Sequence, residues 1–270
     1  MRQFIRIMVA ATVLFAHSLP ALSWGQEGHR IIAKIAYDHL HGKAKKQVDK
    51  VLGKQGMVYW ANWPDEIKSD TIYPQSYDWH FQDFDGGLSD SVVVSALTDY
   101  PKIGGNLFRA TDSLVSVLRD NRQRTQDEDY VHALRFVVHL SGDRFCPMHT
   151  ARLEDKGGNG VKMAWFSKNT NTNLHSVWDT KLIDSQGYSY TEYAQKLEHE
   201  YGWKRKAIEQ MSNEELLLHN YHFTEAIYAY QQTWDGNTYH YIYRWRQPME
   251  EQLYIAGIRL AKLLNDLYNK

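Results

Sequence analysis

Two segments of this chain carry a histidine and an aspartate four residues apart, and this spacing constrains the fold more than any other feature. His139 and Asp143 lie in "HLSGDRFCPMH", and His175 and Asp179 lie in "NLHSVWD". Residues at positions i and i+4 share one face of an α-helix, so each pair predicts a helix that presents an imidazole beside a carboxylate. Both groups are typical ligands of zinc and other transition metals. One such pair is often only a local ion pair, but two pairs together predict a metal centre between helices.

Most of the remaining chain is predicted to be helical. Apolar residues recur at three-to-four spacing, and Gly42, Gly53 and a Ser212–Glu215 capping box mark expected helix ends. Pro248 is predicted to open the last helix, because proline is favoured in a first turn. The expected helices cover 31–40, 43–52, 106–120, 127–143, 216–230 and 248–268. Glycine, proline and short polar residues dominate 54–105 and 150–173, which are predicted to be loops.

The first 23 residues are predicted to be a secretory signal peptide. Two arginines precede the hydrophobic stretch "IMVAATVLFAHSLPAL", and Ala21-Leu22-Ser23 is a small-x-small cleavage site. The hydrophobic stretch is interrupted by polar residues and a proline, so a retained membrane anchor is the less favoured alternative. We therefore expect an exported protein, periplasmic or secreted, whose single domain covers 24–270 and begins at Trp24.

Charge and cysteine content narrow the possible functions. The chain has 31 basic and 32 acidic residues and a net charge of −1. It therefore has no general attraction for a polyanion such as duplex DNA. Affinity for phosphate must come from a local source, such as bound cations. Cys146 is the only cysteine, which excludes an intramolecular disulfide and favours a bacterial periplasm over a eukaryotic secretory route.

Further candidate ligands occupy the predicted loops and the expected mature N-terminus. Asp65 lies in "NWPDEIK", His80 lies in "WHFQDFD", and His149 follows the first His–Asp pair. Removal of the leader would free the α-amine of Trp24, which can chelate a metal ion together with its own carbonyl oxygen. His29 would add an imidazole from the start of the first helix. The cleavage would thus create a ligand that the precursor lacks.

These motifs resemble those of a known family. "WGQEGHR", "NWPDEIK", "WHFQDFD", "HLSGDRFCPMH", "GGN" and "NLHSVWD" occur in the order and spacing of the zinc-dependent single-strand-specific nucleases of the mung bean type. The related zinc-dependent phospholipases C share the fold, but the short Trp24–His29 spacing and the aspartate at position 179 favour the nuclease branch. The resemblance implies a mainly α, single-domain fold of the phospholipase C/nuclease type, with long loops around a trinuclear zinc cleft.

The resemblance also implies which residues hold three zinc ions per chain. The first ion would be held by Asp65, His80, His139 and Asp143. The second would be held by His149, His175 and Asp179, and the third by Trp24, His29 and the other carboxylate oxygen of Asp143.

Two side chains near these ligands are interpreted as structural. Cys146 precedes His149 with the spacing of a Cys-x-x-His ligand pair, but a buried small thiol is the favoured interpretation. His132 lies seven residues before His139 and is interpreted as a helix-surface or supporting histidine.

The implied reaction is hydrolysis of single-stranded DNA or RNA to products that carry a 5′-phosphate, with 3′-nucleotidase activity beside it. In the family, a hydroxide shared between metal ions attacks phosphorus. Asp65 and Asp143 are candidate catalytic residues because they hold those ions. Lys68 matches a basic residue that contacts the phosphate, and is both a catalytic and a substrate-binding candidate.

Preference for single strands has a physical source. Reaching a deep metal site requires a splayed nucleotide, whose base can stack on an aromatic ring, whereas a paired base resists this movement. Phe81 is the candidate for stacking. Asp83 is the candidate for hydrogen bonds to the base edge, and Thr180 occupies a position where some relatives contact the base.

Three alternatives remain open from the sequence. A phospholipase C or another phosphoesterase uses the same cluster, a periplasmic protein can bind zinc or nucleotides without turnover, and a helical scaffold with incidental histidines binds no stoichiometric metal. The expected partners are single-stranded nucleic acid and 3′-nucleotides as substrates, with no stable protein partner and no membrane anchor after cleavage.

Overall fold

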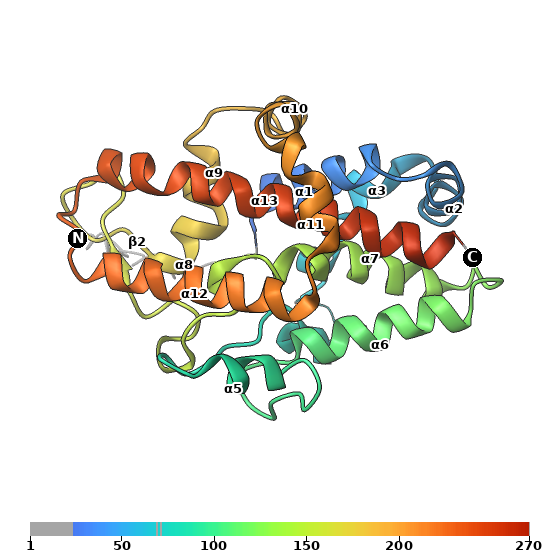
Figure 1. Cartoon of the computed structure of the whole chain (residues 1–270), viewed down its shortest axis with the longest axis horizontal. Coiled ribbons are helices and arrows are strands. Elements are labelled where there is room, and N and C mark those ends of the chain that lie inside the picture. Colours follow the sequence, from blue (N-terminus) through green and yellow to red (C-terminus); the bar gives the residue numbers. More distant parts are fainter. Residues whose placement is uncertain (1–23, 69, 71, 270) are drawn as a thin grey trace, which may run out of the picture.

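Long helices form most of the structure. The computed structural model describes residues 24–68, 70 and 72–269. Its longest elements, α12 (Asn213–Gln231) and α13 (Thr238–Tyr268), extend across much of the molecule (Figure 1). α13 packs against α1 (Gln26–Asp38) and α7 (Glu128–Asp143), and α7 packs against α6 (Leu107–Asp120). The chain is therefore the mainly helical single domain that the sequence predicts.

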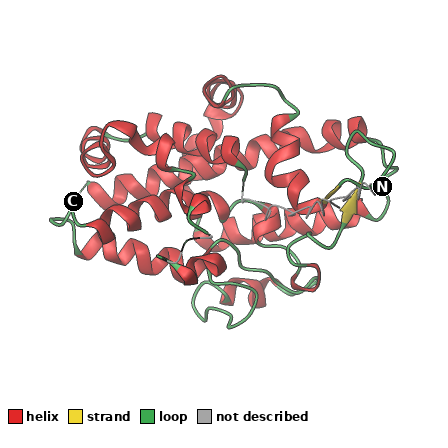
Figure 2. Ribbon diagram, turned by 180° about the vertical axis from the view of Figure 1, so that it is seen from behind, coloured by secondary structure: helices red, strands yellow, loops and turns green. Residues whose placement is uncertain are grey.

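The remaining elements are shorter. Further helices are α2 (Gly42–Leu52), α3 (Gly56–Trp60), α4 (Trp63–Glu66), α5 (Asp90–Ser95), α8 (Leu174–Ser176), α9 (Leu182–Asp184), α10 (Tyr190–Tyr201) and α11 (Arg205–Gln210). Short 3₁₀ segments are η1 (Gly53–Gln55), η2 (Pro74–Trp79), η3 (Pro147–His149), η4 (Leu153–Asp155) and η6 (Gly202–Lys204), whereas η5 (Val177–Lys181) is π-helical. β1 (Lys162–Met163) and β2 (Thr172–Asn173) form one antiparallel pair at an end of the molecule (Figure 2).

The core lies where α1 crosses α13. The predicted apolar face of α1, with Ile31, Ile32 and Ile35, is buried against this long helix. Gly257 of α13 allows the contact, because a Cβ atom there would lie 2.6 Å from Cγ2 of Ile35. The two helices therefore approach more closely than a larger residue would permit.

The predicted start of the last helix is wrong. α13 begins at Thr238, and Pro248 lies inside it. The Asn237 side chain caps the helix by accepting hydrogen bonds from the backbone N–H groups of Tyr239 and His240. A proline inside a helix costs about 3 kcal/mol. The segment before the proline stays helical because aromatic side chains such as Trp245 pack into the core.

Two other boundaries differ from the sequence prediction. Gly42 begins α2 instead of ending the preceding helix, which stops at Asp38. The predicted loop 54–105 contains the short helices α3, α4 and α5 and the segment η2. These elements are too short to show a helical period, and their formation depends on tertiary packing.

The predicted signal peptide lies outside the described residues. Within the described part, no helix combines the length and the apolar character needed to cross a membrane.

Candidate metal centre

The centre begins at the C-terminal end of α7. Acidic residues in the first turn favour this helix, and its last turns carry His139 and Asp143, which are both completely buried. Nε2 of His139 lies 3.4 Å from Oδ2 of Asp143, so the i, i+4 pair shares one face as predicted. α7 ends at Asp143, where the expected helix 127–143 also ends. Pro147 begins the η3 turn that carries His149.

Two residues from other segments complete a first group with this pair. Asp65 lies in α4, and His80 follows η2 directly. Nδ1 of His80 lies 3.1 Å from Oδ2 of Asp143 and 3.0 Å from Nε2 of His139. Oδ1 of Asp65 lies 3.5 Å from the same His139 nitrogen. The structure therefore brings together the four residues predicted for the first metal ion.

A second group forms around Asp179. The Asn173 side chain caps α8, which carries His175, and Asp179 follows in the π-helical segment η5. Nε2 of His175 lies 2.9 Å from Oδ2 of Asp179, and Nε2 of His149 lies 3.7 Å from its Oδ1. Nδ1 of His149 also lies 3.8 Å from Oδ1 of Asp143, which places the two groups side by side.

The start of the described chain packs against both groups. Nε2 of His29 lies 3.3 Å from Oδ1 of Asp143, and its ring stacks on His139 with centroids 3.7 Å apart. Trp24 is completely buried, and its indole N–H donates to the Gly142 carbonyl. The next backbone N–H, of Gly25, donates to the Asp179 carbonyl at 2.6 Å. All nine predicted ligand residues thus converge on one buried region.

Backbone carbonyls orient three of the histidine rings. The Nδ1 atoms of His139, His149 and His175 lie 2.7, 2.5 and 2.6 Å from the carbonyl oxygens of Ala61, His80 and Gly157. Each Nδ1–H donates to its carbonyl, so Nε2 is the ring nitrogen directed toward the carboxylates. Metal-binding histidines are commonly held in this way.

Gly157 makes one of these contacts possible. Its φ of 64° is a left-handed conformation, and a Cβ atom there would lie 2.6 Å from the Met148 carbonyl oxygen. Glycine is therefore required at the first position of the predicted "GGN" motif, where its carbonyl accepts the hydrogen bond from His175.

Several buried polar atoms of the two groups have no hydrogen-bond partner among the described residues. They are Nε2 of His80, Oδ1 of Asp143, Nε2 of His149 and Oδ2 of Asp179. Some of these atoms lie close to an ion-pair partner, but the geometry of the contact is not that of a hydrogen bond. Burying such atoms without a partner is costly. Imidazole nitrogens and carboxylate oxygens in this arrangement fit a divalent metal ion of the zinc type.

Electrostatics favour the metal-binding forms of the carboxylates. Burial by itself would raise the pKa of Asp143, but the neighbouring His139 and His149 hold it well below its usual range. The pKa of Asp65 is also well below its usual range, because His139 and Lys68 outweigh the effect of burial. Burial, followed by the charge of Lys68, lowers the pKa of His80 to about 3, so this ring is neutral.

The pKa of His149 shifts in the opposite direction to that of His80. Although burial opposes it, the carboxylates of Asp143 and Asp179 raise the pKa of His149 to about 9. In the metal-free chain this ring therefore carries a proton that a bound cation would displace.

A cleft of about 640 Å³ opens above the centre. Its wall includes His80, His149 and His175, so both groups reach it. Lys68 also lines the cleft, and its Nζ lies 2.6 Å from Oδ1 of Asp65. The cleft therefore offers a positive side chain directly beside the candidate ligands.

Two predicted base-binding residues lie in the same cleft. Phe81 is half-buried and makes an edge contact with Tyr77, with ring centroids 6.1 Å apart. Asp83 is buried, its Oδ1 has no hydrogen-bond partner among the described residues, and burial raises its pKa to about 7. Its carboxyl group is thus able to accept or donate a hydrogen bond near neutral pH.

Thr180 is not among the residues that line the cleft. Its hydroxyl oxygen lies where a side chain on Gly25 would begin, at 2.6 Å from an added Cβ atom. The geometry therefore gives no support to a base-contacting role for Thr180.

The two side chains interpreted as structural have distinct surroundings. His132 hydrogen-bonds with the Tyr73 hydroxyl at 2.8 Å and stacks on Trp63, away from the candidate ligands.

Cys146 is buried, and its thiol donates to Oδ1 of Asp179 at 3.3 Å, so it lies directly beside the second group. Burial and the charge of Asp179 raise the pKa of this thiol well above its usual range, so it remains protonated.

Sequence reasoning missed two lysines of the cleft. Lys102 and Lys156 line it, although neither belongs to a ligand motif. Lys156 adopts a left-handed conformation immediately before "GGN", and this unusual backbone gives no signal in the composition of the segment.

Comparison with known proteins shows clear similarities. A model described as S1/P1 Nuclease matches residues 24–269. Endonuclease 3 of Arabidopsis thaliana is 30% identical over 274 residues, which cover 92% of this chain and 90% of that protein. Nuclease S1 of Aspergillus oryzae is 26% identical over 189 residues, 69% of this chain and 63% of that protein. Nuclease P1 of Penicillium citrinum is 29% identical over 181 residues, 63% of each chain.

Proposed function

The chain belongs to the S1/P1 nuclease family and is a nuclease, and from this premise we propose that it is a zinc-dependent phosphodiesterase. Its substrates are single-stranded DNA and RNA, its products carry a 5′-phosphate, and it also removes the phosphate of 3′-nucleotides. The observation that carries the proposal is the convergence of buried imidazoles and carboxylates beneath a cleft that Lys68 lines.

The two groups, together with Trp24 and His29, provide the ligands for three zinc ions. The first site comprises Asp65, His80, His139 and Asp143, the second comprises His149, His175 and Asp179, and the third comprises Trp24, His29 and Asp143. The unpartnered buried atoms of the first and second groups support this assignment, because a cation would satisfy them.

Bound zinc would supply a water acidic enough to ionise near neutral pH and positive charge for the phosphate oxygens. The protein side chains position the substrate. Lys68 donates a charge-assisted hydrogen bond to a non-bridging phosphate oxygen, and Asp65 fixes the lysine through the 2.6 Å contact. The carboxylate of Asp143 lies between the groups and holds their imidazoles in fixed positions.

The residues that line the cleft support selectivity for single strands. A nucleotide reaches the candidate ligands only if its base leaves the stack, and an unpaired base does so at lower cost. Phe81 then provides a ring for stacking, and the unpartnered oxygen of Asp83 hydrogen-bonds to the base edge.

Export to a periplasm or to the cell exterior is part of the same proposal. The third zinc site requires the free α-amine of Trp24, and cleavage of the predicted leader would produce it. Trp24 is already buried against Gly142 and the Asp179 segment, which supports this assignment.

A comparison of substrates tests the proposal. The zinc-loaded protein, cut at Trp24, is assayed on single-stranded DNA, RNA, duplex DNA, a 3′-nucleotide and phosphatidylcholine, with and without a chelator. We expect chelator-sensitive hydrolysis of the single strands and the 3′-nucleotide, and much slower cleavage of the duplex. Preferred hydrolysis of phosphatidylcholine would assign the site to a phospholipase C. Bound zinc without any hydrolysis would assign it to a binding protein.

A further inference from the structure

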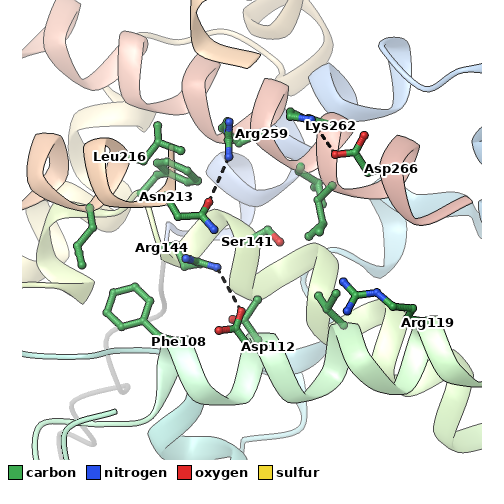
Figure 3. Close-up of a pocket in the computed structure, with 16 residues that line it drawn as sticks. Phe108, Asp112, Arg119, Ser141, Arg144, Asn213, Leu216, Arg259, Lys262 and Asp266 are labelled. Carbon is green, nitrogen blue, oxygen red and sulfur yellow. Dashed lines mark hydrogen bonds and ion pairs between the residues drawn. The ribbon is translucent and has the colours of Figure 1, made fainter. Parts of the chain in front are cut away.

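A second cavity lies on the opposite face of α7 from the metal centre. It has a volume of about 290 Å³ and is lined by residues of α6, α7, α12 and α13 (Figure 3). Ser141 of α7 lines it, and this residue stands about half a helical turn from His139 and Asp143. Neither histidine nor cysteine lines the cavity, so it is chemically distinct from the metal centre.

The charged residues of this cavity give it an excess of positive charge. Arg119, Arg144, Arg259 and Lys262 line it, against two carboxylates, Asp112 and Asp266. Lys262 and Asp266 pair with each other at 2.7 Å and largely cancel. Three arginines then face one aspartate, in a protein whose net charge is −1.

The positive charge of Arg144 is only weakly neutralised, although the side chain is largely buried. Its side chain is only 19% exposed, yet its contact with Asp112 is 4.0 Å long. Among the described residues, no hydrogen bond is found for its guanidinium group, which otherwise lies over the Phe108 ring. Asp112 also accepts a hydrogen bond from the Tyr100 hydroxyl. A guanidinium group in this situation can accommodate a further anionic partner.

Arg259 brings a second charge to the same space. Its Nη1 donates to the carbonyl oxygens of Ile208, Glu209 and Met211 at the end of α11, and its Nη2 donates to Oδ1 of Asn213. All these acceptors are neutral, so these hydrogen bonds do not cancel the positive charge of Arg259. Burial, and then the nearby charge of Arg144, lower the pKa of Arg259, which shows that the two cations affect each other. Figure 3 shows Arg259 and Arg144 approaching the cavity from opposite walls.

We propose that this cavity binds a phosphate dianion, free or as a monoester, between Arg144 and Arg259. A phosphate monoester carries about two negative charges at neutral pH, which matches the excess of positive charge. Planar guanidinium groups also fit phosphate oxygens in pairs. The cavity is larger than a phosphate group, and apolar side chains such as Phe108, Val115 and Leu263 offer a surface for the remainder of an ester.

Two variants with opposite expected effects test the site. The affinity of the zinc-loaded protein for inorganic phosphate and for adenosine 5′-monophosphate is measured by isothermal titration. Arg144→Gln should weaken binding to this cavity about tenfold or more, because a charge-assisted contact is lost. Asp112→Asn should strengthen it roughly fivefold, because the carboxylate that pairs with Arg144 is replaced by a neutral amide. A misfolded variant cannot produce the second effect.

A control and a local measurement separate this cavity from the catalytic cleft, which also binds phosphate. Arg246→Gln removes an exposed arginine from the same helix as Arg259, outside the cavity, and should leave both affinities unchanged. Backbone hydrogen exchange should slow in 108–119 and 212–217 when the ligand is added, since these segments border the cavity and not the cleft. Equal affinity for both ligands would identify free phosphate, and tighter binding of the nucleotide would identify a nucleoside monophosphate.

The proposal is overturned if both phosphate compounds bind the parent, Arg144→Gln and Asp112→Asn with the same affinity. It is also overturned if protection from exchange occurs only around the cleft. Neither result would affect the proposed nuclease function, which depends on chelator-sensitive cleavage of single strands.

Discussion

Nε2 of His139 lies 3.0 Å from Nδ1 of His80, although one histidine lies near the end of a long helix and the other follows a short 3₁₀ segment. Nδ1 of His139 donates to the Ala61 carbonyl, so in the neutral ring Nε2 carries a lone pair. Two imidazole nitrogens at this distance share either a proton or a cation. The carboxylates of Asp65 and Asp143 beside them favour the cation.

His139→Ala should therefore lower the zinc content of the protein and reduce the rate of single-strand hydrolysis at least about 100-fold. A direct ligand contributes more to zinc affinity and activity than a residue that only supports a ligand. His132→Ala is the matched control on the same helix, because the described contacts of His132 are with Tyr73, Trp63 and Glu128. It should keep its zinc. Zinc is counted per chain by elemental analysis, and a full zinc content in His139→Ala would contradict the ligand assignment.

Lys68→Gln should lower kcat/KM for single strands about 10- to 100-fold, because a charge-assisted hydrogen bond to the phosphate contributes about 1.5–3 kcal/mol. Lys68→Arg should retain most of the activity. Lys54→Gln, at an exposed lysine that does not line the cleft, should have no effect. Steady-state measurements of kcat/KM for the three variants test this prediction. A parent-like value in Lys68→Gln would show that this lysine does not hold the substrate.

Cys146→Ser should keep the full zinc content. Zinc binds the thiolate form, whereas burial and Asp179 raise the pKa of Cys146 and keep it protonated. A serine hydroxyl is able to replace the thiol as the donor to Oδ1 of Asp179. Zinc analysis of the purified variant gives the answer, and loss of one ion per chain would make Cys146 a ligand.

Ser212→Ala should destabilise the protein by about 1 kcal/mol, because the hydroxyl caps α12.

The backbone N–H of Ser212 also donates to the Glu215 carboxylate at 2.7 Å, and this contact holds the pKa of Glu215 below its usual value of 4.5. A lowered pKa stabilises the fold at pH values above the pKa of this carboxyl in the unfolded state. The stabilisation is lost as the pH falls through the pKa in the folded state. The difference in urea midpoint between the parent and Glu215→Gln should thus be present at pH 7 and shrink at pH 4. A difference that grows toward acid pH would contradict the capping box.

A form that keeps one extra residue before Trp24 should lack the third zinc ion and most of the activity, because its α-amine is blocked. The form that begins at Trp24 is the control, and both retain the buried indole contact with Gly142. Mass spectrometry verifies each N-terminus before zinc analysis and assay. Equal zinc content and equal rates in the two forms would exclude the α-amine as a ligand.

The helical parts of the fold and the candidate centre were largely predictable because their signals are local. The His139–Asp143 and His175–Asp179 spacings each identify one helical face, and the structure places each pair in contact. Asp65 and His80 lie in predicted loops, and only their motifs suggested that they join the pair on α7. The short helices around them are fixed by tertiary contacts that no periodicity reveals.

Features that depend on distant residues were not predictable. Pro248 indicates a helix start locally, but burial of the preceding aromatic residues extends α13 through it. The cavity of Arg144 and Arg259 combines side chains from four helices, and an arginine within an amphipathic helix gives no sign of which neighbours it will meet.

Return of zinc to the metal-free protein tests the central claim most directly. Zinc is removed from the form that begins at Trp24 by chelation and added back stepwise, while hydrolysis of single-stranded DNA is followed. We predict no turnover without zinc, and activity that rises until three ions are bound per chain. Undiminished turnover by the zinc-free protein would contradict the account.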